Sequence, residues 1–164
     1  MSTFLALHHV SVLVSDTERA LLFYRDLLGL SLDESRPALD FPGAWLVVGD
    51  QQIHLIEIPQ HMPAGPVVAH GGRDRHFALL VSDLEPVRCR LEAGGADYTL
   101  SRSGRRALFC RDPDGNTIEL VERPEAQRAA AAVTVALSRC LRMAFSRHST
   151  CCCCVSGRLL RSVM

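Results

Sequence analysis

Short runs of alternating apolar and polar residues divide the chain into predicted elements. The runs that follow His9 and His76 predict strands, and so do the later runs 45–48, 53–58, 107–110 and 117–121. Residues 17–28 and 84–93 instead place their apolar side chains at helical spacing. We therefore predict two modules of the order strand–helix–strand–strand–strand, and an α+β fold.

Local signals predict where these elements begin and end. A hydroxyl followed three residues later by Glu is a capping box, a Gly after the last helical residue ends a helix, and Asp-rich or Asn-Gly segments form turns. These signals are two capping boxes (Ser15 with Glu18, Ser82 with Glu85), two helix-ending glycines (Gly29, Gly94) and two hairpin turns (Asp50–Gln51 and 112–116).

The two modules are copies of one another. The segment 9–16, His-Val-Ser-Val-Leu-Val-Ser-Asp, has a near copy at 76–83, and Ile-His-Leu-Ile-Glu at 53–57 matches Ile-Glu-Leu-Val-Glu at 118–122. The offsets are 67 and 65 residues, so the order of the two matches is kept. We interpret residues 1–123 as a tandem duplication, with modules at about 5–58 and 74–123 joined by a Pro- and Gly-rich linker.

Charge marks a boundary after the second module. Residues 1–123 hold 17 acidic residues and 12 arginines, whereas residues 124–164 hold six arginines and one acid. The second segment is rich in Ala, Arg and Cys, with four consecutive cysteines at 151–154 that lack the usual spacing of zinc ligands. We expect a basic C-terminal extension, helical or disordered, and assign it no function.

Composition removes several classes of function. Every one of the 18 basic residues is Arg, so Schiff-base chemistry through lysine is excluded. No run of 18 apolar residues and no basic N-terminal region is present, so we expect a cytoplasmic protein without a membrane partner. Cys89 and Cys110 are predicted to be buried small hydrophobes in a reducing compartment.

The duplication places four metal-capable side chains at matching points. His9 and His76 open the first strand of each module, and His54 and Glu119 occupy one equivalent position in the last strand. A single His on an apolar strand is more often a satisfied core residue, but recurrence at symmetry-related points favours a site. Imidazole and carboxylate suit Zn, Ni, Co, Mn or Fe(II) and do not select one of them.

The motifs resemble those of the vicinal oxygen chelate superfamily, which includes glyoxalase I, bleomycin-resistance proteins and extradiol dioxygenases. They are His-Val-x-x-x-Val-x-Asp at 9–16, Phe-Tyr-x-x-x-Leu-Gly-Leu at 23–30 and Asp-Pro-Asp-Gly-Asn-x-Ile-Glu-Leu at 112–120, within a resemblance covering 5–123. The segment 40–46 with 53–55 resembles a glyoxalase-like subgroup.

The resemblance implies a fold, an assembly and a chemistry. The paired modules would curl into an open, incomplete barrel around one metal ion. Two such sites would form in a homodimer, with His9 and His54 from one chain and His76 and Glu119 from the other. The metal would act as a Lewis acid on a small substrate chelated through neighbouring oxygens. We therefore expect a small-molecule substrate and no nucleic-acid partner.

The activity itself stays open at this stage. A glyoxalase-like lyase or isomerase is the first hypothesis, with Glu119 as ligand and general base. Glyoxalase I commonly has Glu where His54 stands, which leaves Glu119 as the one carboxylate among the four donors. An extradiol dioxygenase or a fosfomycin-type thiol transferase is the alternative, because His9, His76 and Glu119 also form the ligand set of those enzymes. A metal-free drug-binding protein of the bleomycin-resistance type is the third.

Other pocket residues have weaker support in the sequence. Trp45, the single tryptophan, begins a strand that would face the cavity, and it is equally suited to a core. Arg105 and Arg106 precede a strand of the second module and are candidates to clamp an anionic group, with Arg106 preferred as a substrate-binding residue. His8 is expected to point to the face opposite His9, and His61 and His70 to lie exposed in the linker.

Overall fold

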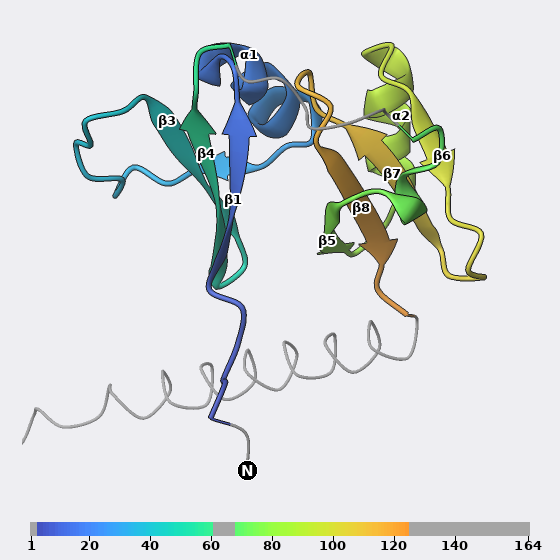
Figure 1. The fold of residues 1–164 in the computed structure, drawn as a ribbon. Coiled ribbons are helices and arrows are strands. Elements are labelled where there is room, and N and C mark those ends of the chain that lie inside the picture. The colour runs from blue at the N-terminus through green and yellow to red at the C-terminus, as the bar shows by residue number, and fades with distance from the viewer. Residues whose placement is uncertain (1–2, 61–67, 125–164) are drawn as a thin grey trace, which may run out of the picture. The chain divides into compact units, whose positions relative to one another are not determined.

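Two four-stranded mixed sheets form the framework of the described chain, residues 3–60 and 68–124, in the computed structural model (Figure 1). The first module contains β1 (His9–Val14), α1 (Thr17–Leu21), the π-helical turn η1 (Leu22–Leu27), β2 (Ser31–Leu32), β3 (Gly43–Val48) and β4 (Gln51–Glu57). A 3-10 turn, η2 (Gly71–Arg73), precedes the second module, which contains β5 (His76–Val81), α2 (Glu85–Ala93), β6 (Tyr98–Leu100), β7 (Ala107–Arg111) and β8 (Thr117–Glu122).

The two sheets have the same topology. Their strand orders are β1-β4-β3-β2 and β5-β8-β7-β6, with the first and last strands of each module parallel and the other pairs antiparallel. The prediction of an α+β fold from two tandem modules is therefore confirmed. Closure of the two sheets around a common centre stays a prediction.

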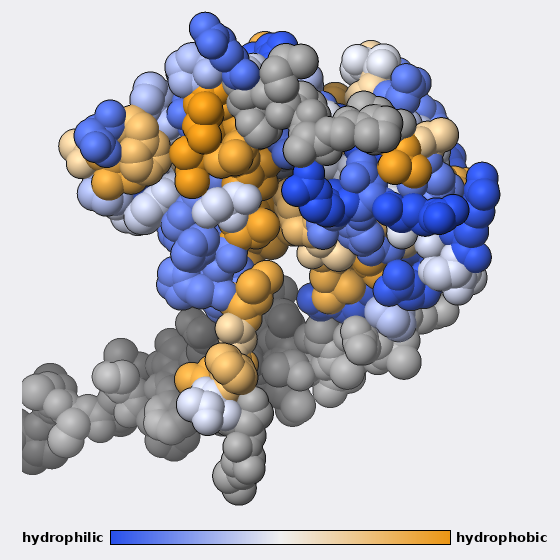
Figure 2. Space-filling view, viewed as in Figure 1, coloured by the Kyte–Doolittle hydropathy of each residue, from blue (hydrophilic) through white to orange (hydrophobic). Residues whose placement is uncertain are grey.

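Alternation along the strands separates a core face from a second face in each sheet. Val12 and Val14 of β1 and Ile53 and Leu55 of β4 are at most 4% exposed, and they pack with the helices in one hydrophobic core. The intervening residues, which include His9 and His54, lie on the other face. Figure 2 shows apolar side chains gathered over the strands of the first module.

The helices begin differently from the predicted capping boxes. Asp16 caps α1 by accepting a hydrogen bond from the Arg19 backbone, and Leu84, with no side-chain cap, precedes α2. Distant glutamates of the last strands supply acceptors instead. Glu57 accepts from the backbone N–H of Thr17 at 2.8 Å, and Glu122 accepts from that of Leu84 at 3.3 Å. The capping-box prediction was wrong because Asp16 and Asp83 accept from the early helical N–H groups of Arg19 and Glu85, and the Ser15 N–H bonds to Asp114.

The ends of both helices and the first hairpin turn also differ from the predictions, by helix type or by one residue. The predicted helix 17–28 runs as an α-helix only to Leu21 and continues as a π-helical turn. Gly29 has the predicted positive φ of 83°, but at the end of α2 Gly95, not Gly94, has one, of 66°. The first hairpin turn is Gly49–Asp50, since Val48 already pairs with Gln51.

The segment 112–116 forms the predicted turn and also joins the two modules. Asp112 accepts hydrogen bonds from the Tyr24 hydroxyl at 3.0 Å and from the backbone of Asn116 at 2.8 Å. The Asn116 amide donates to the carbonyl of Leu13, and Asp114 pairs with Arg19 at 2.6 Å. This superfamily-like motif is therefore a structural link between a turn of the second module and the helix and first strand of the first.

The chain divides by its internal contacts into residues 1–123 and 124–164. Two predictions fall on residues outside the described ones: that the C-terminal extension is helical or disordered, and that His61 is exposed. No helix in the described ranges is long and apolar enough to cross a membrane. Cys110 is buried as predicted, whereas Cys89 is exposed on α2, because its side chain lies on the outer face of that helix.

Candidate metal centre

The four predicted donors lie on the non-core faces of the two sheets. His9 and His76 stand at the starts of β1 and β5, the strands whose parallel neighbours β4 and β8 carry His54 and Glu119. The fold therefore brings the donors together in two pairs, one for each module. Each pair has its own surroundings.

His76 and Glu119 form the first pair, with His76 Nε2 3.4 Å from Glu119 Oε2. The Nδ1 atom of His76 lies 2.8 Å from the carbonyl oxygen of Asp74, which can only accept, so Nδ1 carries a proton. Nε2 is then the ring nitrogen that faces the carboxylate. Two ligand atoms of one zinc-sized ion are about 3.0–3.4 Å apart, so this pair fits two adjacent positions around a cation.

His9 and His54 form the second pair, but their rings are stacked. The ring centroids are 4.2 Å apart with an interplanar angle of 11°, and Trp45 stacks on His54 at 4.3 Å and 9°. A ring nitrogen binds a metal in the plane of its ring. Two nearly parallel planes do not meet at bonding distance, so this arrangement does not direct both imidazoles at one ion.

Polar contacts hold the second pair as well. His54 Nε2 is 2.9 Å from Gln52 Oε1. His9 Nδ1 is 2.9 Å from His8 Nδ1, so the expectation that His8 points to the face opposite His9 was wrong. Burial, and then the charges of His9 and His8, lower the pKa of His54, which keeps its ring neutral near pH 7. Among residues 3–60 and 68–124, no group of three or more His, Cys, Asp or Glu side chains converges on one point.

Arginine contacts distinguish the two faces of β8. Arg105 approaches Glu119 Oε1 at 3.2 Å with its own side chain 60% exposed. Arg106 pairs instead with Glu122 at 3.1 Å. Because Glu119 and Glu122 differ by an odd number of positions, they lie on opposite faces of the strand. The arginine next to the candidate site is therefore Arg105, and the structure places Arg106 elsewhere.

Comparison with known proteins identifies the family of this fold. Residues 6–120 match the model of the Glyoxalase/Bleomycin resistance protein/Dioxygenase superfamily. The chain belongs to this superfamily.

Individual relatives of this superfamily chain differ in their described activities. "Glyoxylase I 4" of Arabidopsis thaliana is 32% identical over 120 residues, covering 70% of this chain and 69% of the relative. "Glutathione transferase FosA" of Serratia marcescens is 32% identical over 120 residues, covering 70% and 79%. A solved glyoxalase family protein from Bacillus anthracis matches with a TM-score of 0.61 at 23% identity, over 76% of this chain and 99% of that one, which supports the fold.

An aromatic ring stands beside a donor in each module. Trp45 pairs with His54 across β3 and β4, and Phe109 pairs with Glu119 across β7 and β8. The Phe109 ring lies edge-on to His76, with centroids 5.3 Å apart. The structure thus brings Trp45 and Phe109 to the donor-bearing faces, and a substrate-binding role for Trp45 stays a prediction.

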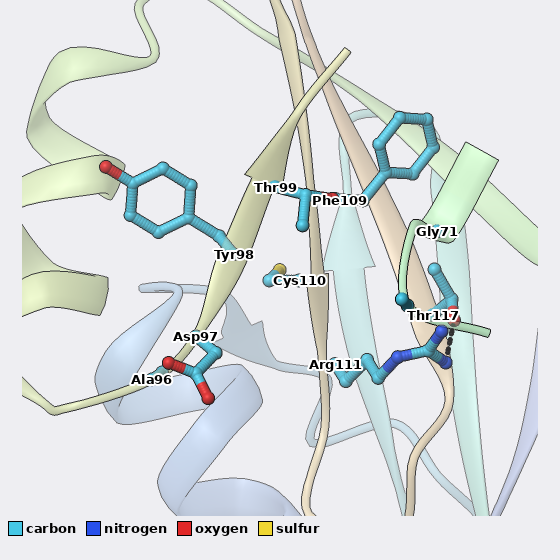
Figure 3. Close-up of a pocket in the computed structure, with 10 residues that line it drawn as sticks. Gly71, Ala96, Asp97, Tyr98, Thr99, Phe109, Cys110, Arg111 and Thr117 are labelled. Atoms are coloured by element: carbon cyan, nitrogen blue, oxygen red, sulfur yellow. Dashed lines mark hydrogen bonds between the residues drawn. The ribbon is translucent and has the colours of Figure 1, made fainter. Parts of the chain in front are cut away.

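The turn η2 packs closely on this second face. A Cβ atom at Gly71 would lie 2.6 Å from Phe109 Cβ and 2.8 Å from Thr117 Cγ2, so only glycine allows the approach. A pocket of about 290 Å³ opens beside this contact, lined by Phe109, Arg111 and Thr117 among others (Figure 3). His70, expected to lie exposed in the linker, caps η2 and its Nε2 atom lies 3.1 Å from the carbonyl oxygen of Leu100.

Arg111 supports the pair of His76 and Glu119 through Asp74. Its guanidinium bonds to Asp74 at 2.6 Å and to the carbonyls of Val68 and Gly115. The hydrogen bond from Arg111 is the largest cause that lowers the pKa of Asp74. Asp74 in turn holds His76 through its carbonyl oxygen. A fixed acceptor of this kind sets the orientation of a metal-binding imidazole.

Several of these residues were missed by sequence reasoning. Asp74, Arg105 and Phe109 come from neighbouring strands or turns, and nothing in local spacing ties them to a donor. Gln52 had a usable signal, because it lies two residues before His54 and therefore on the same strand face.

Proposed function

We propose that this chain is a metal-dependent enzyme, a glyoxalase-like lyase or isomerase that acts on a small substrate bound through two neighbouring oxygens. The contact between His76 Nε2 and Glu119 Oε2 supports the proposal most directly. With Nδ1 of His76 donating to the Asp74 carbonyl, Nε2 is the ring nitrogen that can share a cation with Glu119. The Glu119 side chain is 5% exposed and pairs with Arg105 through Oε1, so Oε2 is the oxygen left to face a cation.

The proposed site is completed by a second copy of the chain, whose first module carries His9 and His54. One chain brings at most two donors together among its described residues, whereas a catalytic metal site takes three or more. When bound, a divalent ion such as Zn, Ni, Co, Mn or Fe(II) supplies Lewis-acid polarisation of the substrate oxygens.

Glu119 is the proposed general base. It is held by His76 on one oxygen and by Arg105 on the other, so its orientation is set before substrate arrives. A carboxylate in this position can remove a proton next to a polarised carbonyl. Arg105, which is mostly exposed, is placed to neutralise an anionic group of the substrate.

A thiol transferase is the second candidate. The Serratia relative described as a glutathione transferase is as similar as the Arabidopsis glyoxylase, at 32% identity. In such an enzyme Glu119 would only bind the metal and would not move a proton.

The substitution Glu119→Gln separates these functions. We expect the variant to keep bound metal through its amide oxygen, and to lose about 10²–10⁴-fold in turnover as a lyase. Metal content is measured after purification without a chelating column, and turnover as formation of lactoylglutathione. Transfer of glutathione to fosfomycin is assayed in parallel.

Glu122→Gln is the matched control, since it makes the same change on the opposite face of β8. It should lower stability and leave turnover per folded molecule unchanged. Near-normal lyase turnover of metal-loaded Glu119→Gln would contradict the general-base role. Wild-type protein that binds no divalent metal would contradict the proposal and favour a metal-free binding protein.

A further inference from the structure

A short stretch of chain, residues 68–74, crosses the second sheet before β5 begins, and we call it the strap. At one end it contacts the edge strand β6, and in the middle Gly71 lies against Phe109 of β7 and Thr117 of β8. Thr117 is two residues before Glu119 on β8, so both are on the same face of the sheet. The strap therefore covers part of the donor-bearing face.

The equivalent segment of the first module is exposed. By the offset of the repeat, residues 3–7 precede β1 as 70–74 precede β5. Leu5 and Leu7 are 97% and 65% exposed, whereas Gly71 is buried. The strap is therefore particular to the second module, and specific contacts must hold it in place.

Arg111 makes contacts that hold both ends of the strap at any ordinary pH. Its guanidinium donates to the carbonyl of Val68 at 2.7 Å and to the carboxylate of Asp74 at 2.6 Å. Arginine stays charged, and the hydrogen bond from Arg111 lowers the pKa of Asp74, so that carboxylate stays ionised. These contacts do not change in mildly acidic solution.

His70 makes two further contacts, and together they require a neutral ring. Its Nε2 lies 3.1 Å from the carbonyl oxygen of Leu100, which can only accept, so Nε2 carries a hydrogen. Its Nδ1 accepts from the backbone N–H of Gly72 at 3.0 Å, so Nδ1 is bare. An imidazolium carries a hydrogen on both nitrogens and would turn one of them toward the Gly72 N–H. The cap of η2 is then lost.

The surroundings of His70 offer little to stabilise an imidazolium. Its ring packs on Phe109, with 5.4 Å between centroids. Asp74 is already paired with Arg111, and among the residues that the structure describes no carboxylate forms an ion pair with His70. The titratable and charged groups on the elements packed against it are Arg73 and Asp74 at η2, Tyr98 on β6, and Cys110 and Arg111 on β7.

We propose that His70 is a pH-sensitive contact of the strap: its neutral ring fastens η2 over the second sheet, and its protonation in mildly acidic solution releases that turn. Imidazole is the side chain that changes charge between about pH 5 and pH 8. Ala69 and Gly71 of the strap line the pocket of about 290 Å³ beside Phe109, so release of η2 would open this pocket (Figure 3). The proposal does not rest on the proposed function.

Hydrogen exchange of the Gly72 amide in the full chain tests this proposal. The quantity measured by NMR is the protection factor, the exchange rate of an unstructured peptide divided by that of the protein at the same pH. We expect it to fall about 3- to 10-fold from about pH 8 to about pH 5.5, the effect of losing one hydrogen bond. The amide of Ala96, which donates to the carbonyl of Leu91 at 2.9 Å, is the internal control and should keep its protection.

Two substitutions separate the imidazole from the rest of the strap. His70→Asn supplies a cap that does not titrate, since its side-chain oxygen can accept from the Gly72 N–H, and its protection should be the same at both pH values. His70→Ala has no cap and should be poorly protected at both. An unchanged protection factor in the wild type would overturn the proposal, and so would a fall in His70→Asn equal to that of the wild type. A parallel fall at Ala96 would also overturn it, because the whole module would then loosen.

Discussion

Residues of one type have different chemistry in this molecule because their burial differs. Cys110 is 1% exposed on the core face of β7, and burial followed by the charge of Asp112 raises the pKa of its thiol to about 12. Cys89 is exposed on α2. The thiolate is the reactive form, so burial and the raised pKa both protect Cys110, whereas Cys89 is open to a reagent.

We therefore predict selective alkylation of the two cysteines. In native protein at pH 8, iodoacetamide should modify Cys89 and leave Cys110 intact, and both should react after denaturation. Peptide mapping by mass spectrometry separates them from the cysteines of the C-terminal extension. Equal labelling of the two in folded protein would show that β7 opens on the time scale of the reaction.

At the scale of elements, side chains from one module stabilise structure in the other. The Tyr24 hydroxyl, in η1, donates to Asp112 in the turn between β7 and β8, and Tyr24 is fully buried. Asp112 uses its other oxygen to hold the backbone of Asp114 and Asn116. The turn keeps its shape partly because Tyr24, in a helical turn of the first module, donates a hydrogen bond to Asp112.

Tyr24→Phe should accordingly destabilise the fold. Removing the hydroxyl leaves a buried carboxylate with one partner fewer, and we expect a loss of about 1–3 kcal/mol in the free energy of unfolding. The measurement is urea unfolding followed by circular dichroism. Tyr98→Phe is the matched control: its hydroxyl also meets a carboxylate, Glu92, at 2.6 Å, but in an exposed place. That control should change stability by less than about 0.5 kcal/mol, and equal losses would contradict the linking role of Tyr24.

At the scale of the whole molecule, the donor-bearing faces carry exposed apolar side chains. Leu13, Val47 and Leu80 lie on these faces by strand alternation and are 36%, 39% and 54% exposed. Apolar side chains near unfinished ligand pairs fit a surface covered by a second copy. The assembly and the site would then form together.

We predict a dimer that depends on this surface. Wild-type protein at micromolar concentration should have the mass of two chains in light scattering. Leu80→Glu should give single chains and weaken metal binding, because a charge at the centre of an apolar contact opposes association. Leu22→Glu, with 62% exposure on η1, is the control and should remain dimeric. A wild-type monomer that binds one metal ion tightly would contradict a shared site.

Periodicity and repetition were sufficient to predict much of this protein. Alternation at the strands and helical spacing at 17–28 and 84–93 follow from which side of an element is buried, and that information is local. The duplication then identified His9, His54, His76 and Glu119 as matching positions. Because the turn signal at 112–116 lies within five consecutive residues, the existence of the turn could also be predicted from the sequence.

The tertiary structure decided how those residues are held. Helix starts use Glu57 and Glu122 from distant strands, and local capping boxes could not reveal a carboxylate some 40 residues away. Strand register and ring orientation decide three contacts. His76 pairs with Glu119, His54 stacks on Trp45, and Arg105 rather than Arg106 approaches Glu119. These are properties of neighbouring strands, so the sequence predicts which groups are present, and only packing decides which atoms of those groups face one another.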